Sequence, residues 1–142
     1  MNVTAKLKEK GISPSITRVK IYEYLYGNKN HPTVNDVYIS LSEEIPTLSK
    51  TTVYNTVKLL REKGLVQLIT INEEQVRIDG NPDFHGHFLC SECEEVFDFE
   101  VPKLEVALPK GFEVNTGEVY YMGLCKCCSD KKFVKQKRKN IN

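Results

Sequence analysis

The sequence lacks the features of a membrane or secreted protein. No apolar run approaches the roughly 18 residues that a membrane-spanning helix needs, and residues 1–6 contain no apolar signal-peptide core. These absences predict a cytoplasmic protein. Because that compartment is reducing, the five cysteines are expected to bind metal instead of pairing as disulfides. At 142 residues the chain can form one domain or two small ones.

Histidine is scarce, and its few copies are unevenly placed. Two of the three histidines are His85 and His87, which come directly before the cysteine pair Cys90 and Cys93. A second cysteine group occupies residues 125–128. Nitrogen and sulfur ligands are therefore concentrated in the last third of the chain. This distribution predicts two metal sites of different chemistry.

The net charge of +1 conceals a strong segregation of charge. Residues 1–80 carry 11 basic and 9 acidic side chains, residues 81–130 carry 3 and 10, and residues 131–142 carry 6 and none. The acidic segment repels phosphate but suits divalent cations. The basic tail over 131–142 can contact DNA or an acidic partner, although a solvated end is the favoured interpretation.

Two helices are predicted before residue 45. Ser13 followed by Pro14 fits an N-cap with proline at the first helical position. A helical apolar stripe follows at Ile16, Val19, Tyr22 and Leu25. Thr33 with Asp36 three residues later is a variant capping box that opens the second helix. The apolar spacing of this second helix is that of an amphipathic helix, at Val34, Val37, Tyr38 and Leu41.

A third helix and a hairpin complete the first part of the chain. The helix is expected to begin at Ser49 and to end at Gly64. Residues 65–71 and 75–78 alternate like strands around a polar turn and predict a hairpin. Three helices followed by a hairpin is the order of a winged helix-turn-helix. We assign residues 1–79 to a DNA-binding domain.

The third helix carries the strongest indication of DNA binding. Its apolar positions face inward, and its opposite face is polar, with positions 51, 54, 55 and 58 on one side. Such a face reaches base edges and phosphates from the major groove. Asn55 can pair with adenine, whereas a solvated polar face on a core helix is the alternative. The DNA-binding candidates are Arg18, Lys50, Thr51, Thr52, Tyr54, Asn55 and Lys58.

The remaining residues predict a small α/β unit. Residues 80–84 form a turn and a candidate hinge, and residues 85–130 are assigned to a metal-binding dimerisation domain. Strands are expected at 87–89 and 96–99, a brief helix at 103–108, and a longer strand over 112–114 and 118–124. So few elements need a staple or a partner subunit. The fold class is therefore α+β.

A four-cysteine zinc site would provide this staple. Four thiolates satisfy tetrahedral zinc, and the matching two-residue spacing on both sides favours Cys90, Cys93, Cys125 and Cys128. Cys127 is a possible replacement for Cys128, and redox-labile thiols are the alternative to zinc. A structural zinc site contributes on the order of 10 kcal/mol to apparent folding free energy. Loss of one cysteine should therefore unfold the second domain.

The second metal site requires nitrogen and oxygen ligands. His85 and His87 are two residues apart on an extended segment, so both can face one side of a strand. The remaining candidates give the set His31, Asp79, His85, His87 and Asp98. Such a set suits Fe(II), Mn(II) or Zn(II) better than Cu(I). Taken singly, a turn cap is the alternative interpretation of His31, and surface charges are the alternative for the two aspartates.

Several motifs resemble the ferric uptake regulator family, most closely its peroxide-responsive repressor branch. They cover nearly the whole chain in order: residues 31–38, 51–55 and 77–79, then 85–93 and 125–128. The resemblance implies a dimeric winged-helix repressor with structural zinc in four cysteines. It also implies Fe(II) or Mn(II) in a site that bridges two domains, whose ligands correspond to His31, Asp79, His85, His87 and Asp98. The resemblance further implies that peroxide would oxidise His31 or His85 to 2-oxo-histidine, which releases palindromic operator DNA.

Two positions favour the peroxide-responsive branch, and one segment departs from other members. Asp98 stands where iron-responsive members usually carry Glu, and Asn55 stands where many iron sensors have Arg. Residues 115–117 replace histidines that other members place before the last strand. An iron- or zinc-responsive repressor is the nearest alternative, distinguished by the metal that restores operator binding. An enzyme is disfavoured because no separate nucleophile or substrate-pocket motif is present, and the polar third helix disfavours a simple interaction module.

Overall fold

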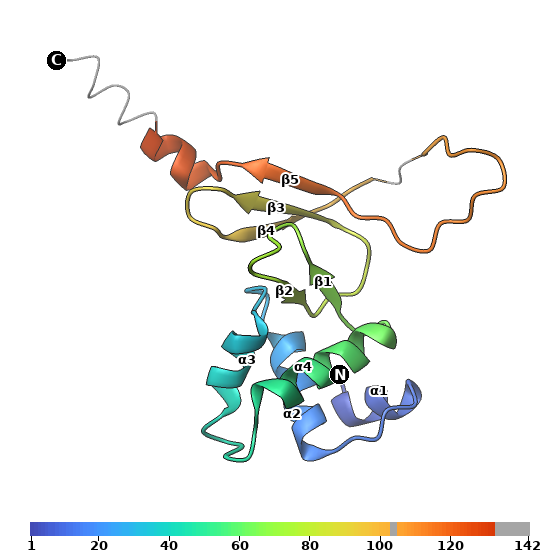
Figure 1. Ribbon diagram of the computed structural model, residues 1–142, viewed down its shortest axis with the longest axis vertical. Coiled ribbons are helices and arrows are strands. Elements are labelled where there is room, and N and C mark those ends of the chain that lie inside the picture. Colours follow the sequence, from blue (N-terminus) through green and yellow to red (C-terminus); the bar gives the residue numbers. More distant parts are fainter. Residues whose placement is uncertain (103–104, 133–142) are drawn as a thin grey trace. The chain divides into compact units, whose positions relative to one another are not determined.

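The computed structural model describes residues 1–102 and 105–132 and confirms the α+β class (Figure 1). The chain divides into two compact units, Met1–Pro82 and Asp83–Asn142. None of the described helices is both long enough and apolar enough to span a bilayer.

The first unit contains four helices and a two-stranded hairpin. The helices are α1 (Val3–Glu9), α2 (Ile16–Gly27), α3 (Val34–Leu41) and α4 (Lys50–Glu62), and the strands are β1 (Gln67–Ile69) and β2 (Arg77–Asp79). The strands pair antiparallel, with Leu68 opposite Ile78. Helices α2, α3 and α4 with this hairpin form the predicted winged helix-turn-helix.

The start of α2 differs from the prediction. Its N-cap is Ser15 and not Ser13, because the Ser15 hydroxyl accepts the Arg18 backbone N–H at 3.2 Å. Ile16, predicted to face the core, is 78% exposed, and Ile21 takes the inward position. The helix α1 was not predicted; it buries Val3 and Leu7 in the core, at helical i, i+4 spacing.

The predicted ends of α3 and α4 are confirmed. Thr33 and Asp36 form the reciprocal capping box at the start of α3. Ser49 caps α4 through the Thr52 backbone N–H. Gly64 ends α4 with φ +73°, a conformation that glycine adopts without a steric penalty. The next N–H, from Leu65, then returns to the Leu60 carbonyl at 2.9 Å.

The second unit contains a three-stranded sheet and a short helical segment. Its strands are β3 (Gly86–Cys90), β4 (Val96–Phe99) and β5 (Tyr120–Gly123), in the order β4-β3-β5. Strand β3 runs antiparallel to β4 and parallel to β5. Residues 126–132 are helical. The predicted basic tail lies outside the described residues from position 133 onward.

Two predictions for this unit are wrong. Residues 105–108 are not helical, and residues 103–104 of that predicted helix lie outside the described residues. The long strand shrinks to β5: residues 112–114 and 118–119 are not strand in the described part of the chain, although the Val119 carbonyl still accepts the His87 N–H at 3.0 Å. A long loop precedes β5 instead (Figure 1).

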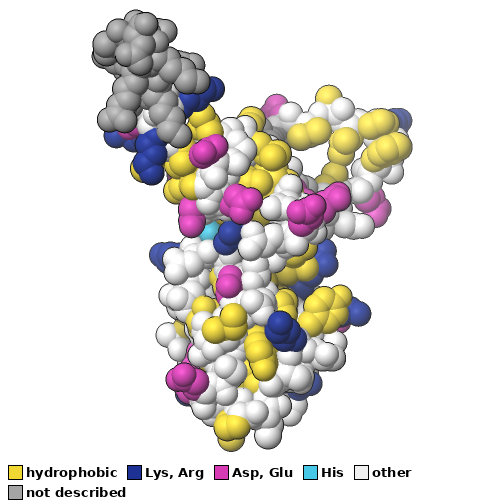
Figure 2. Space-filling view, turned by 60° about the vertical axis from the view of Figure 1, so that its left-hand side comes forward, with side chains coloured by type: hydrophobic (Ala, Val, Ile, Leu, Met, Phe, Trp, Pro, Cys, Tyr) yellow, Lys and Arg dark blue, Asp and Glu magenta, His cyan; other side chains and the backbone are white. Residues whose placement is uncertain are grey.

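Many large apolar side chains of the second unit are exposed. They lie on the long loop, as Figure 2 shows, and on β5: Val106, Leu108, Phe112, Val114, Tyr121 and Met122. So many exposed large apolar side chains are uncommon on a monomer.

Candidate metal centres and DNA-binding face

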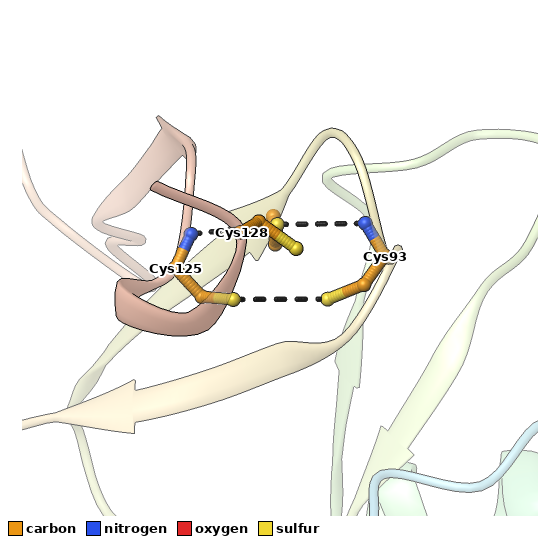
Figure 3. A group of neighbouring side chains, drawn as sticks. Cys93, Cys125 and Cys128 are labelled. Atoms are coloured by element: carbon orange, nitrogen blue, oxygen red, sulfur yellow. Dashed lines mark hydrogen bonds between the residues drawn. The ribbon is translucent and has the colours of Figure 1, made fainter. Parts of the chain in front are cut away.

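The four predicted zinc cysteines come together in the second unit. Cys90 and Cys93 lie at the turn after β3, and Cys125 and Cys128 lie at the start of the helical segment after β5. Their four Sγ atoms all lie within 4.8 Å of one another. The side chains labelled in Figure 3 point inward from these two turns. Cys127 is exposed and does not belong to this group.

This cluster has the dimensions and the electrostatics of a zinc site. Four sulfurs at about 2.3 Å from one tetrahedral zinc ion would lie about 3.8 Å apart, and the Sγ atoms of Cys93 and Cys125 lie 3.9 Å apart. The backbone N–H of Cys125, then that of Cys93, donates to the Cys90 sulfur and lowers the pKa of Cys90 to about 6. Burial raises the pKa of Cys128 to about 12, together with the neighbouring thiols, since both increase the cost of a negative charge there. Four thiolates in this position therefore require a cation.

His31 and Asp79 form a buried pair in the first unit. His31 Nε2 lies 3.5 Å from Asp79 Oδ2, and both side chains are buried. His31 has φ +52°, a left-handed conformation that costs about 1–3 kcal/mol in a residue other than glycine. Such a conformation persists only where the surroundings hold it in place.

Two hydrogen bonds hold the His31 loop against β2. Arg77 Nη1 donates to the His31 carbonyl at 3.1 Å. The Ile78 backbone N–H donates to the Pro32 carbonyl at 2.8 Å. Asp79 Oδ1 accepts the Asn81 N–H at 2.9 Å, which leaves Oδ2 on the side of the imidazole. The neighbouring backbone thus aims both side chains.

His85, His87 and Asp98 converge in the second unit. In the β3–β4 pairing, His87 lies opposite Asp98. The Nε2 atoms of His85 and His87 lie 3.3 and 3.2 Å from the same oxygen, Asp98 Oδ1. The Asp83 carbonyl, 2.6 Å from His85 Nδ1, can only accept, so Nδ1 donates to it and Nε2 is the nitrogen that faces Asp98. Supporting bonds of this type are typical of histidines that bind metal.

Gly86 allows this arrangement of the two histidines. A Cβ atom at this position would overlap the ring of Phe99, which packs directly on the Gly86 backbone. Strand β3 therefore needs glycine between His85 and His87. The role of Gly86 was not predicted, and neither were the supporting roles of Arg77, Asn81 and Asp83, because each depends on a contact with another segment.

The predicted DNA-binding side chains of α4 are exposed. Val53, Val57 and Leu60 are buried against the rest of the first unit, and the exposed face carries Lys50, Thr51, Thr52, Tyr54, Asn55 and Lys58. A cavity lies beside each edge of the helix. One, of about 680 Å³, borders Tyr54, Lys58 and the hairpin. The other, of about 210 Å³, borders Arg18 and Asn55.

Comparison with known proteins identifies the family. The model of the ferric uptake regulator family matches residues 9–129. The peroxide operon regulator of Bacillus subtilis (strain 168) is 35% identical over 130 residues, which cover 88% of this chain and 90% of that protein. The structure of PerR from Streptococcus pyogenes aligns with a TM-score of 0.53 and 25% identity, covering 89% of this chain and 90% of that chain.

A further solved structure agrees in fold. The ferric uptake regulator of Pseudomonas aeruginosa, solved with manganese, aligns with a TM-score of 0.68 and 21% identity. The alignment covers 89% of this chain and 99% of that one. The family match spans every candidate metal ligand, from His31 to Cys128. The chain belongs to the ferric uptake regulator family.

Proposed function

We propose that this protein is a metal-dependent transcriptional repressor that senses peroxide and binds palindromic operator DNA as a homodimer. The observation that carries the proposal is the pair of half-sites, one in each unit. His31 and Asp79 belong to the winged-helix unit, and His85, His87 and Asp98 belong to the sheet unit. Neither half alone provides the five ligands of a regulatory Fe(II) or Mn(II) site.

The two half-sites account for metal-dependent repression. Coordination favours only the state in which both units offer their ligands together. Residues 80–84 connect the assigned domains, 1–79 and 85–130, and act as the hinge. Gly80 itself packs against the Leu25 carbonyl, where a Cβ atom would clash, so bending is expected beyond this residue. His31 transmits closure to α4 through the first unit.

His31 and His85 are the proposed oxidation-sensitive residues. Bound Fe(II) supplies the redox chemistry through which peroxide attacks a neighbouring imidazole. One peroxide oxygen is added to the ring carbon between the two nitrogens, and the other leaves as water. In 2-oxo-histidine both ring nitrogens carry hydrogen and no longer offer a basic lone pair, so the oxidised His31 or His85 no longer binds the metal, the units separate and α4 leaves the operator.

The remaining parts fit the same proposal. Zn(II) bound by Cys90, Cys93, Cys125 and Cys128 stabilises the second unit. A second copy covers the exposed apolar surface of the long loop and β5, which accounts for dimerisation. The dimer then presents two α4 helices about 34 Å apart, one DNA turn. We propose that the protein acts in the cytoplasm, and we assign it no catalytic function.

Reconstitution with defined metals tests the sensor proposal. We expect the Zn-stapled protein loaded with Fe(II) to bind its operator, to lose binding after stoichiometric peroxide, and to gain one oxygen on the His31 or His85 peptide. The Mn(II) form should keep both binding and mass. The absence of added oxygen on either peptide would contradict peroxide sensing. Restoration of binding by Fe(II) or Zn(II) without peroxide sensitivity would favour the alternative, an iron- or zinc-responsive repressor.

A pair of tyrosine variants tests the DNA-binding face. Tyr54→Ala removes an exposed ring on α4, and Tyr26→Ala removes an exposed ring on α2. We expect Tyr54→Ala to abolish operator binding in a mobility-shift assay while metal content and dimerisation are kept. Tyr26→Ala should bind normally. Equal affinity of the two variants would contradict the assignment of α4.

A further inference from the structure

A small polar cavity lies between the first turn of α2 and one edge of α4. We call it the α2 niche. Its volume is about 210 Å³, and its polar lining consists of Ser15, Thr17, Arg18, Thr52, Asn55 and Thr56. No carboxylate lines it. The larger cavity on the other edge of α4 differs, because Asp36, Glu73 and Glu74 all border it. An anion is therefore repelled from one edge of α4 and not from the other.

Hydrogen-bond donors gather at the α2 niche. The first turn of α2 leaves backbone N–H groups without helical partners and carries a positive partial charge. Among the described residues, the Thr17 N–H has no acceptor. The Arg18 guanidinium donates through Nη1 to the Ser13 carbonyl at 3.0 Å, which anchors it beside the cavity. Its remaining N–H groups are available to an anion.

Thr56 is the second, independent indication of a ligand. Its side chain is only 6% exposed, yet within the described part of the chain its hydroxyl makes no hydrogen bond. By contrast, the neighbouring Thr52 hydroxyl bonds Ser49 Oγ at 2.9 Å. Because no described side-chain oxygen is both fully buried and unpartnered, the Thr56 hydroxyl must open onto the cavity. Because Thr56 lines the α2 niche, an acceptor in the cavity would satisfy it.

We propose that the α2 niche holds one backbone phosphate of double-stranded DNA. The proposal rests on the repressor function and deepens it by separating two roles on α4. Thr56 and Asn55, with Arg18 and the Thr17 N–H, grip the phosphate and set the register of the helix. Tyr54 and Lys58, on the other edge, face the bases. Asn55 is thereby reassigned from reading adenine to positioning the backbone.

A phosphate contact has a signature that a base contact lacks. Every duplex offers the same phosphate, so loss of the contact weakens binding to operator and unrelated DNA by the same factor. Loss of Arg18 in addition removes one neutralised phosphate charge. The slope of log K against log salt should then become shallower by about one.

The first test uses isosteric variants of the Zn- and Mn(II)-loaded full chain. Two duplexes of equal length serve as probes, one obtained by in vitro selection and one scrambled. Thr56→Val and Arg18→Gln should each weaken binding to both duplexes by about tenfold. Thr56→Ser, which keeps the hydroxyl, should bind like the original protein. The matched controls are Thr4→Val on α1 and Lys20→Gln on α2. In the original protein the Lys20 ammonium pairs with Glu44 at 3.4 Å.

Several outcomes of this test would contradict the phosphate proposal. One is equal DNA affinity of Thr56→Val and Thr4→Val. Another is a loss of affinity that is confined to the selected duplex. A lower melting temperature with unchanged affinity would assign Thr56 a packing role only. If the original protein binds neither duplex, the repressor function fails, and inorganic phosphate then tests the niche by itself.

A second test locates the phosphate. Neutral methylphosphonates are introduced one at a time along the selected duplex. In each half of the duplex, the methylphosphonate at one position should weaken binding by the original protein by about tenfold. The same methylphosphonate should have no further effect on binding by Arg18→Gln. Persistence of the full effect in Arg18→Gln at every position would overturn the proposal.

Titration with inorganic phosphate gives an arm that is independent of DNA. Saturable NMR shifts of the Thr17 and Arg18 amides, absent in Thr56→Val, are expected. If DNA leaves these amides unshifted while phosphate moves them, the niche takes a free anion, and the DNA proposal is wrong. If neither probe moves them, the niche is not an anion site.

Discussion

The two units of this protein differ in what stabilises the inside of each one. The hydrophobic core cluster lies wholly within the first unit, between Val3 and Ile78. Among the described residues of the second unit, the buried apolar side chains are Leu89, Cys90, Val96 and Cys128, two of which are candidate zinc ligands. About half of the large apolar side chains in the described part of this unit are exposed instead. The first unit is stabilised by its own core, whereas the second, as proposed above, relies on a metal and on a covering surface.

This difference matches the division of labour in the proposed function. A unit that inserts a helix into DNA must keep its shape by itself, and a local core provides this. A unit that dimerises needs an exposed apolar face, so it has fewer apolar residues left for its interior. Four cysteines compensate, because zinc binding contributes folding free energy that does not depend on burial.

The largest expected effect separates the two units by removing the zinc site. Cys125→Ser should lose bound zinc and, with it, on the order of 10 kcal/mol of apparent stability. Hydrogen exchange should show loss of protection in β3 and β4 but not in α4. Cys127→Ser, next to the site but outside the four-sulfur group, is the matched control and should keep both zinc and protection. Equal protection in the two variants would break the comparison.

A truncation in the hydrophobic core should destabilise the first unit and leave the second unchanged. Leu60 is fully buried in α4, so Leu60→Ala should destabilise the first unit by about 2–5 kcal/mol in urea unfolding. Zinc stoichiometry should not change. Ile39→Ala, at an exposed position on α3, should alter stability by less than about 0.5 kcal/mol. Zinc loss from Leu60→Ala would show that the units do not stabilise themselves separately.

A third prediction concerns the bond that orients His31. Arg77→Gln removes the donor to the His31 carbonyl without removing a ligand. We expect Mn(II) affinity to fall by about 10- to 100-fold, as is typical when a supporting residue of a metal ligand is lost. Zinc content should be unchanged, and Arg61→Gln on α4 serves as the control. If both variants bind Mn(II) equally, Arg77 does not position the regulatory half-site.

The smallest effect is expected at a helix cap. Thr33→Ala breaks the capping box of α3 and should cost the first unit about 1 kcal/mol. Thr51→Ala, inside α4, removes a similar hydroxyl without a capping role. Thermal unfolding of the two variants should differ by a few degrees. Identical melting would mean that the capping box adds nothing to the stability of this unit.

Features that depend on residues close together in the chain were predictable from the sequence. The capping box at Thr33 and the glycine stop at Gly64 depend on residues within one turn of a helix. The i, i+2 spacing of His85 and His87 predicts a shared strand face, and both rings do approach Asp98 Oδ1. The α2 cap was misplaced because Ser13 and Ser15 are both plausible caps, and only the Arg18 N–H distinguishes them.

Features that depend on distant partners were not predictable. Residues 112–114 have strand-like composition, but a strand exists only where another strand accepts its hydrogen bonds, and β3 pairs with β5 instead. The left-handed backbone of His31 is maintained by Arg77, 46 residues away in the chain. The role proposed for Asn55 depends on its closeness to the first turn of α2, which helix periodicity does not reveal.

The sequence by itself determined which chemistry this protein carries: four thiols, three imidazoles and the two aspartates that accompany them, a polar helix and the class of fold. Ligand identity and helix signals reside in side chains and in spacings of a few residues, so they survive without coordinates. The tertiary structure decided how each unit arranges its half-site, which apolar residues stay exposed, and which hydroxyl opens onto the polar cavity beside α4. These properties arise from contacts between segments far apart in the chain, which only the folded backbone brings within bonding distance.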